Sequence, residues 1–120
     1  MLVVDDHADT AEILSTLLAA QGFVVRIATS AAEALSLCAT LKFDLVISDV
    51  GLPDRTGYDL MSEIRTKFPD LPGIAMSGWG RDEDRKVGLA AGFSEHLTKP
   101  IALNDLVAAI HRTLAASGSR

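Results

Sequence analysis

The chain alternates between short apolar runs and stretches in which apolar residues recur every three or four positions. A short apolar run is typical of a buried strand, and the longer recurrence is typical of one face of a helix. The pattern predicts strands at Leu2–Val4, Val24–Ala28, Leu45–Ser48, Gly73–Met76 and Glu95–Thr98. Strands that alternate with helices in this way favour a parallel sheet covered by helices on both faces, because each crossover restores the strand direction.

A helical stretch follows each predicted strand. Asp9 and Glu12 are placed as a cap pair for the first helix, and Ser30 and Glu33 form a capping box for the second. The fourth helix, over residues 81–91, is more polar than the others and ends at Gly92. The apolar stripes of the other helices are Ile13, Leu14, Leu17 and Leu18; Ala34, Leu35, Cys38 and Leu41; Tyr58, Met61, Ile64 and Phe68; and Leu103, Leu106, Val107, Ile110 and Leu114.

Length and charge narrow the class of protein. With 120 residues, 48% of them hydrophobic, the chain is long enough for one globular domain with its own core. A net charge of −5 with scattered basic residues argues against nucleic acid as a partner. Cys38 is the only cysteine, which excludes an internal disulfide, and we predict that it is a small buried hydrophobic residue. Because no apolar run has the length of a membrane span, we expect a cytoplasmic, monomeric domain without membrane contact.

Polar residues stand directly after four of the predicted strands. Asp5 and Asp6 follow the first strand, Asp49 the third, Ser77 the fourth and Lys99 the fifth. Ligands of such sheets bind beyond the carboxyl ends of the strands, so we expect these side chains to converge on one shallow cleft. Three carboxylates in one cleft repel one another unless a cation lies between them. A divalent cation with oxygen ligands removes that cost, and we predict Mg²⁺ there, with Mn²⁺ as a substitute.

The same residues have the chemistry of phosphoryl transfer. A carboxylate attacks phosphorus to form an acyl phosphate, and the reaction depends mainly on positioning and on neutralising the phosphoryl oxygens. Asp49, at the centre of the cleft, is the predicted acceptor. We predict that the Lys99 ammonium and the Ser77 hydroxyl contact the phosphoryl oxygens.

The acidic residues are assigned as metal ligands. We predict that Asp6, Asp49 and the Gly51 carbonyl oxygen bind Mg²⁺ directly, and that Asp5 supports the ion through water. His7 stands beside the acidic pair, but an imidazole suits Mg²⁺ poorly, so we predict that it is an exposed residue and not a ligand.

The chain resembles the receiver domains of two-component response regulators over essentially its full length. The features that carry this resemblance are Val3-Val4-Asp5-Asp6, Asp49 followed by Gly51-Leu52-Pro53 and Gly57, Ser77, the Ala91-Gly92 turn, and Lys99-Pro100. The resemblance implies an α/β, flavodoxin-like (βα)5 three-layer sandwich with strand order 2-1-3-4-5, formed by residues 1–116 with a frayed tail over 117–120. It also implies that Asp49 receives a phosphoryl group from the phosphohistidine of a histidine kinase or a histidine phosphotransfer domain. Slow self-catalysed hydrolysis would then reset the signal.

Three segments look most like receivers fused to hybrid sensor histidine kinases. They are Gly51-Leu52-Pro53, Ser77-Gly78-Trp79-Gly80 and His96-Leu97-Thr98-Lys99-Pro100. The resemblance places Trp79 on a mobile loop that gates access to the phosphorylation site, and a core position is the alternative for this residue. It also implies a cis peptide bond between Lys99 and Pro100, which aims the Lys99 ammonium into the cleft.

His96 departs from the pattern of these receivers, which usually have Tyr or Phe three residues before the lysine. In them the ring moves inward when the Ser or Thr hydroxyl swings toward the phosphoryl group. An imidazole buries less apolar area, so we expect its inward state to be less strongly favoured. We therefore expect phosphorylation to change the surface around His96 only modestly. The partner-docking surface would then lie around the first helix and the Lys99-Pro100 turn, where a histidine-bearing helical domain would bind.

Two other functions compete with a phosphoacceptor switch. A hydrolase of the haloacid dehalogenase type also phosphorylates an aspartate and binds Mg²⁺, but it needs a second acid two residues after the nucleophile, where this chain has Gly51. A degenerate receiver that serves only as a protein-docking module is the other alternative. The presence of the acidic pair together with Asp49, Ser77 and Lys99 argues against it. A phosphoacceptor of this kind catalyses its own phosphorylation and dephosphorylation, and it is not a stand-alone enzyme.

Overall fold

The computed structural model describes residues 1–78 and 82–117 of the chain. Strands and helices alternate along it, as the apolar pattern predicts. The elements are β1 (Leu2–Val4), α1 (Ala8–Ala20), β2 (Arg26–Ala28), α2 (Ala31–Thr40), β3 (Val46–Asp49), α3 (Gly57–Lys67), β4 (Gly73–Ser77), α4 (Asp82–Ala91), β5 (Glu95–Thr98) and α5 (Leu103–Ser117).

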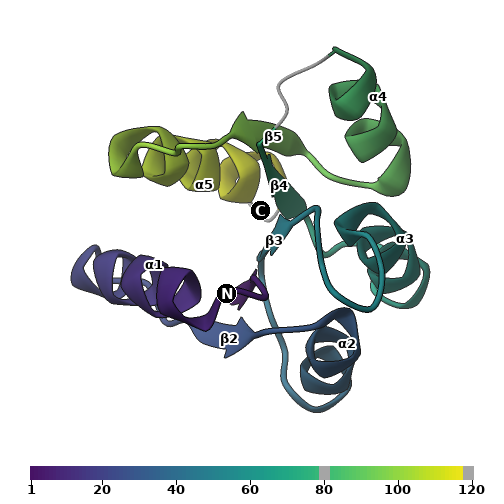
Figure 1. The fold of residues 1–120 in the computed structure, drawn as a ribbon, viewed down its shortest axis with the longest axis horizontal. Helices are drawn as coiled ribbons and strands as arrows, with labels where there is room; N and C mark the ends of the chain where they lie inside the picture. The colour runs from purple at the N-terminus through teal and green to yellow at the C-terminus, as the bar shows by residue number, and fades with distance from the viewer. Residues whose placement is uncertain (79–81, 118–120) are drawn as a thin grey trace.

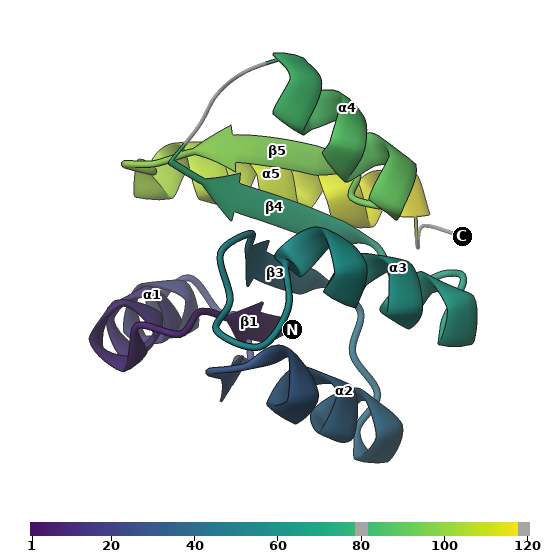
Figure 2. The ribbon, with the colours of Figure 1, turned by 45° about the vertical axis from the view of Figure 1, so that its right-hand side comes forward.

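The strands form one parallel sheet in the order β2-β1-β3-β4-β5, which confirms the predicted topology. Helices α1 and α5 cover one face of this sheet, and α2, α3 and α4 cover the other (Figures 1 and 2). The chain starts in the interior of the sheet, moves outward to β2 and then crosses back to β3. The winding direction therefore reverses between β1 and β3, and the carboxyl ends of these two strands form the crevice in which ligands of such sheets bind.

Each face of the sheet has its own hydrophobic core, because successive strand residues point to opposite faces. Leu2 and Val4 are fully buried against α2 and α3, whereas Val3 is buried against α1 and α5. Cys38 packs in the first of these cores, and burial raises the pKa of its thiol. This confirms Cys38 as a packing residue. In the described part of the chain, no helix is both long and apolar enough to span a membrane.

The start of α1 differs from the prediction. The N-cap residue is His7, whose side chain makes no capping hydrogen bond, so the predicted cap pair of Asp9 and Glu12 is wrong. The backbone N–H of His7 instead donates to Asp5 Oδ1 at 2.9 Å. A carboxylate at the end of β1 thus accepts a hydrogen bond beside the helix N-terminus, and Asp9, the acid of the first turn, is exposed.

The buried face of α1 is rotated relative to the predicted stripe. Ala11 and Leu18 are fully buried and Leu14 packs against the core cluster that contains Leu18, whereas Ile13 and Leu17 are 63% and 41% exposed. A run of Ile-Leu and Leu-Leu pairs fits two adjacent stripes of a helix equally well, and contact with the sheet selects one of them. The other stripe is an apolar strip on the surface.

The second strand is shorter than predicted and covers only Arg26–Ala28. Val24 precedes the ladder and is 81% exposed, so its β-branched side chain does not mark a buried position. The Ser30 half of the capping box that follows is confirmed, because Ser30 Oγ accepts the backbone N–H of Glu33 at 3.1 Å. The Glu33 carboxylate accepts the N–H of Thr29 at 2.7 Å, one residue before the N-cap Ser30, instead of the N–H of Ser30 that completes a capping box.

The remaining differences lie at the ends of strands and helices. Strand β3 is shifted by one residue from the predicted Leu45–Ser48, and β4 extends one residue past the predicted Met76. Leu41 and Phe68 lie one residue past α2 and α3, where they are 39% and 36% exposed instead of belonging to a buried stripe. The predicted stops at Gly22 and Gly92 are confirmed by their positive φ angles of 96° and 112°. Helix α5 ends at Ser117, one residue past the predicted domain boundary.

Candidate functional site at the carboxyl ends of the strands

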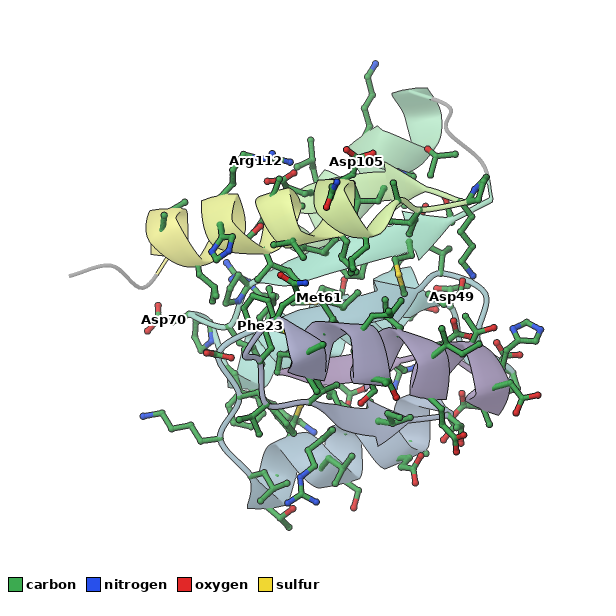
Figure 3. All side chains as sticks on the ribbon, turned by 90° about the vertical axis from the view of Figure 1, so that its left-hand side faces the viewer. Phe23, Asp49, Met61, Asp70, Asp105 and Arg112 are labelled. Atoms are coloured by element: carbon green, nitrogen blue, oxygen red, sulfur yellow. The ribbon has the colours of Figure 1, made fainter. Side chains whose placement is uncertain are left out.

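The structure brings the predicted polar residues to one edge of the sheet. Asp5 and Asp6 follow β1, Asp49 and Ser77 are the last residues of β3 and β4, and Lys99 follows β5. Strand order places β1 beside β3, and the side chains of Asp5 and Asp49 both lie within 4.0 Å of the Lys99 ammonium. Figure 3 shows Asp49 at this edge of the molecule and Asp70 at the opposite edge.

Asp49 and Lys99 form the central contact of the site. The Lys99 ammonium donates to Asp49 Oδ2 at 2.6 Å, although 50 residues separate the two along the chain. Asp49 Oδ1 accepts the backbone N–H of Gly51 at 3.0 Å. The backbone N–H of Lys99 donates to the Ser77 carbonyl oxygen at 2.7 Å. The Lys99–Pro100 peptide bond is cis, as predicted. The cation therefore lies directly against the most central carboxylate.

The acidic cluster carries more negative charge than Lys99 neutralises. Asp5 is fully buried and Asp49 is 6% exposed. Among the described residues, the buried oxygens Asp5 Oδ2 and Asp6 Oδ1 have no hydrogen-bond partner. The basic groups near them are the Lys99 ammonium, 4.0 Å from Asp5 Oδ2, and His7 Nδ1, 3.3 Å from Asp6 Oδ1. Desolvated carboxylate oxygens that accept no hydrogen bond are costly, so this arrangement favours a bound cation.

The donor set fits a hard divalent cation. Single ligand atoms of Asp5, Asp6, His7 and Asp49 lie within 4.8 Å of one another, close enough for one ion to reach several of them. Three of the four groups are carboxylates, the ligand type that Mg²⁺ and Mn²⁺ prefer. His7 is exposed, as predicted, with its Nδ1 atom 3.3 Å from one oxygen of each neighbouring aspartate.

The loop after Asp49 is tied to two helices. The backbone N–H of Gly57 donates to the Val50 carbonyl oxygen at 2.7 Å, and a Cβ atom at this position would collide with the Asp49 carbonyl oxygen. Only glycine fits so close an approach of backbone to backbone. The Thr56 side chain caps α3 by accepting the N–H of Asp59 at 3.1 Å. The loop is therefore held against the end of β3, next to the candidate acceptor.

Asp54 anchors the same loop to α2, which the sequence did not indicate. Its two carboxylate oxygens accept the backbone N–H groups of Ala31 and Ala32, each at 3.0 Å. These hydrogen bonds lower the pKa of the Asp54 carboxyl below its ordinary value, and the hydrogen bond from Ala31 contributes most to this shift. An aspartate from the loop thus satisfies the first N–H groups of a helix whose own N-cap is Ser30.

We expect the stabilising contribution of Asp54 to depend on pH. Because its folded-state pKa is lowered, the contribution is fully present above the unfolded value of about 3.9 and is lost as pH falls through the lower folded value. Urea unfolding of the wild type and of Asp54→Asn should therefore give a difference in unfolding free energy that is constant at neutral pH and shrinks below about pH 4. Asp70→Asn, which changes an exposed carboxylate at the other end of the sheet, is the control. A difference that grows on acidification would contradict the assignment.

Ser77 and His96 form a hydrogen bond that the sequence analysis did not predict. Ser77 Oγ and His96 Nε2 lie 2.9 Å apart, and Ser77 is 3% exposed. His96 itself is half-buried. The His96 ring is thus in contact with the Ser77 hydroxyl. This is the ring whose inward state we expected to be only weakly favoured. Trp79, the other predicted switch residue, lies outside the described residues.

Comparisons with known proteins agree with this geometry. The family model for the response regulator receiver domain matches residues 1–111. The chain is 39% identical over 109 residues to the "Uncharacterized 14.6 kDa protein in sodA1 3'region" of Leptolyngbya boryana, covering 89% of this chain and 83% of that protein. It is 34% identical to the transcriptional regulatory protein CusR of Escherichia coli, covering 99% of this chain and 52% of that protein. The chain thus spans about half the length of such regulators.

A solved structure shares the whole fold. The response regulator receiver domain protein (CheY-like) from Methanospirillum hungatei JF-1 superposes with a TM-score of 0.91 at 28% identity, covering 97% of this chain and 93% of that chain. The resemblance to receivers of hybrid histidine kinases stays a prediction.

Proposed function

The chain belongs to the response regulator receiver domain family, and from this premise we propose that Asp49 receives a phosphoryl group from a phosphohistidine and loses it slowly by hydrolysis. The observation that carries the proposal is the 2.6 Å contact between the Lys99 ammonium and Asp49 Oδ2. It provides a nucleophile and a neutralising cation at the same point, which is what phosphoryl transfer requires of a protein. Receiver domains of this family act in two-component signal transduction.

Each residue has a defined part in the proposed transfer. A carboxylate oxygen of Asp49 forms a bond to phosphorus while the bond from phosphorus to the donor imidazole nitrogen breaks, and that nitrogen keeps the electron pair. Lys99 exchanges part of its contact with Asp49 for the transferred phosphoryl oxygens, where negative charge gathers. The Ser77 hydroxyl donates to another of these oxygens. Attack by water on phosphorus later releases inorganic phosphate and restores the Asp49 carboxylate.

Receiver domains bind Mg²⁺ in an acidic pocket, and the cluster described above fits that ion. We assign Asp6, Asp49 and the Gly51 carbonyl oxygen as its direct ligands, and Asp5 as a residue that holds it through water. When bound, Mg²⁺ neutralises phosphoryl oxygens and the clustered carboxylates. Mn²⁺, which also prefers carboxylate and water ligands, would substitute for it.

Acetyl phosphate in the presence of Mg²⁺ tests the proposal directly. The intact chain should gain the mass of one phosphoryl group, and peptide mapping should locate it on Asp49. Absence of any mass gain would favour the docking module, and rapid turnover of generic phosphomonoesters would favour the hydrolase. The proposal expects labelling without such turnover, because the chain has no second acid two residues after Asp49.

Receiver domains interact with histidine kinases or histidine phosphotransfer proteins, and the exposed strip of α1 is the proposed docking surface on this chain. Ile13 and Leu17 are the exposed apolar residues of this strip, with Asp9, Glu12 and Thr16 beside them along one shallow groove. Helix α1 begins three residues after Asp5, so its N-terminal end is close to the acidic cluster. A helical domain that presents a phosphohistidine has an apolar surface to pack against beside the acceptor.

We expect Ile13→Ser to slow phosphoryl transfer from a phosphorylated histidine phosphotransfer domain by about fivefold or more. Ile13 is the more exposed apolar residue of the strip, and truncating one of the few contacts that dominate an interface costs over about 1 kcal/mol. Transfer from acetyl phosphate should be unchanged, since the small donor needs no docking surface. Leu89→Ser is the matched control, because Leu89 on α4 is also 63% exposed. Equal effects of the two substitutions, measured by stopped-flow or quenched-flow transfer, would contradict the surface.

A further inference from the structure

The hydrogen bond between Ser77 and His96 joins the candidate site to the neighbouring edge strand. In the ladder of β4 and β5, Ala75 lies opposite His96 and Ser77 lies opposite Thr98. The His96 side chain therefore leans along the strand past the small Ala75 side chain and reaches Ser77 Oγ with its Nε2 atom, at 2.9 Å. Ser77 and His96 are 19 residues apart in sequence. In the ladder, Ser77 is two residues along β4 from Ala75, the residue opposite His96.

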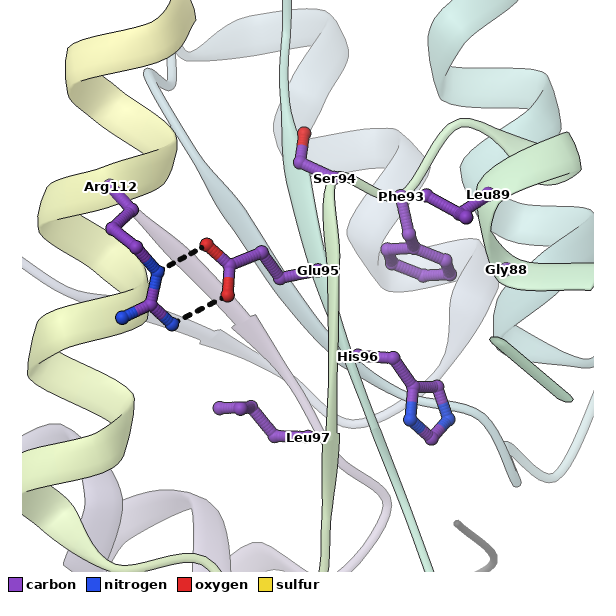
Figure 4. A pocket seen from close by; sticks show the side chains of 8 residues that line it. All are labelled: Gly88, Leu89, Phe93, Ser94, Glu95, His96, Leu97 and Arg112. Carbon is purple, nitrogen blue, oxygen red and sulfur yellow. Dashed lines mark hydrogen bonds and ion pairs between the residues drawn. The ribbon is translucent and has the colours of Figure 1, made fainter. Parts of the chain in front are cut away.

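The His96 ring lies on one side of β5 only. Figure 4 shows it on the same side as Phe93 and α4, whereas Glu95 and Leu97 point to the opposite side, toward α5. Glu95 is engaged there by Arg112, whose Nε and Nη2 atoms donate to the two carboxylate oxygens at 2.9 and 2.7 Å. The hydrogen bond of His96 with Ser77 is thus separated from this ion pair by the strand itself.

The two possible directions of the hydrogen bond have opposite consequences for Ser77. A hydroxyl has one hydrogen and two lone pairs, and a neutral imidazole has one N–H and one acceptor nitrogen. If Ser77 donates to Nε2, its only hydrogen is unavailable to a phosphoryl oxygen. If the Nε2–H group donates to Ser77 Oγ, His96 does not occupy that hydrogen, and a hydrogen bond from Ser77 to a phosphoryl oxygen would continue the chain.

We propose that His96 is a positioning residue for Ser77, with Nε2–H donating to Ser77 Oγ so that the Ser77 hydroxyl donates to an oxygen of the phosphoryl group on Asp49. This inference rests on the proposed function of Asp49. A hydrogen bond to an anionic phosphoryl oxygen is charge-assisted, and a chain of hydrogen bonds strengthens each member. The resemblance leads one to expect Tyr or Phe at this position, and neither would make the same contact with Ser77. Phe has no polar side-chain atom, and the hydroxyl of Tyr lies beyond the ring.

The arrangement also gives a reason for a modest change at the surface of β5. The His96 ring contacts the Ser77 hydroxyl in this structure. If phosphorylation of Asp49 keeps this contact, as the proposal requires, the phosphoryl group has little differential affinity for a second ring position, and a ligand shifts an equilibrium only by such a difference.

A double-mutant cycle separates this role from a merely structural one. Initial rates of Asp49 phosphorylation by acetyl phosphate with Mg²⁺ are measured for the wild type, His96→Phe, Ser77→Ala and the double variant. We expect His96→Phe to slow phosphorylation by about two- to tenfold, the range that one hydrogen bond spans. The double variant should be no slower than Ser77→Ala alone, because His96 acts through the Ser77 hydroxyl. A wild-type rate for His96→Phe, or effects that multiply in the double variant, would overturn the proposal.

Two further measurements keep the inference distinct from the proposed function. His96→Gln, whose amide nitrogen can donate to Ser77, should recover most of the wild-type rate, whereas a rate equal to that of His96→Phe counts against the donor role. Nitrogen-15 imidazole spectra of the beryllofluoride-loaded chain, recorded near pH 8 where an ordinary imidazole is neutral, should place the hydrogen of His96 on Nε2. A hydrogen on Nδ1 would refute the relay even if Asp49 is phosphorylated normally. A wild-type chain that takes up no phosphoryl group on Asp49 would instead overturn the proposed function, and with it the relay.

Discussion

Asp49→Asn is expected to take up no phosphoryl group from acetyl phosphate and Mg²⁺ under conditions in which the wild type takes up one. The substitution replaces an anionic oxygen with a neutral amide of nearly the same size, so the packing at the end of β3 is kept while the nucleophile is lost. Lys99 loses its 2.6 Å charged partner and retains Asp5 at 4.0 Å. Intact-mass spectrometry after a fixed incubation measures the outcome.

Asp70→Asn is the matched control for this substitution. It makes the same chemical change at an exposed carboxylate, and Figure 3 shows Asp70 at the edge of the sheet opposite Asp49. We expect this variant to be labelled at the wild-type rate. Stoichiometric labelling of Asp49→Asn would show that another residue is the acceptor, and the proposed function would then fail. Retained helical circular dichroism in both variants would exclude misfolding as the reason for any loss.

The alternation of strands and helices and the position of the site could be predicted because both depend on local patterns, whereas the strand order was implied by the resemblance to receiver domains. Short apolar runs mark the strands, and a parallel sheet collects at one edge whatever follows each strand, so Asp49 and Lys99 meet although 50 residues separate them. Predicting this contact requires only the positions of the strand ends and the topology of the sheet. It requires no knowledge of side-chain packing.

Features that depend on tertiary packing could not be predicted in the same way. Asp54 caps α2 from a loop 22 and 23 residues away, and no local motif marks a cap supplied across the chain. The choice between the Ile13–Leu17 stripe and the Leu14–Leu18 stripe of α1 depends on how the helix rotates against the sheet. The hydrogen bond between Ser77 and His96 depends on strand register and on the small Ala75 side chain. Each of these features can be identified only from the three-dimensional structure.

Asp6→Asn is expected to weaken Mg²⁺ binding by about tenfold or more, since even the outer partners of metal ligands commonly contribute 10- to 100-fold in affinity. The buried Asp6 Oδ1 atom makes no hydrogen bond among the described residues, and the exposed His7 ring lies 3.3 Å from it, so this oxygen can serve as a ligand of a cation. An amide oxygen in its place carries no charge and balances less of the charge of the ion. Phosphorylation by acetyl phosphate should slow with it, because the neutralisation of the phosphoryl oxygens is weakened.

Isothermal titration with Mg²⁺ measures this affinity without reference to phosphorylation, and Asp9→Asn is its control. Asp9 is an exposed acid in the first turn of α1, three residues from Asp6, and it lies outside the acidic cluster. If general negative charge attracted the ion, both variants would weaken binding to the same small extent, as long-range charges do in water. If Asp6 is a ligand, only Asp6→Asn has a large effect. Unchanged affinity in Asp6→Asn would remove this residue from the metal site and leave Asp5 and Asp49 as the carboxylates available to hold the ion.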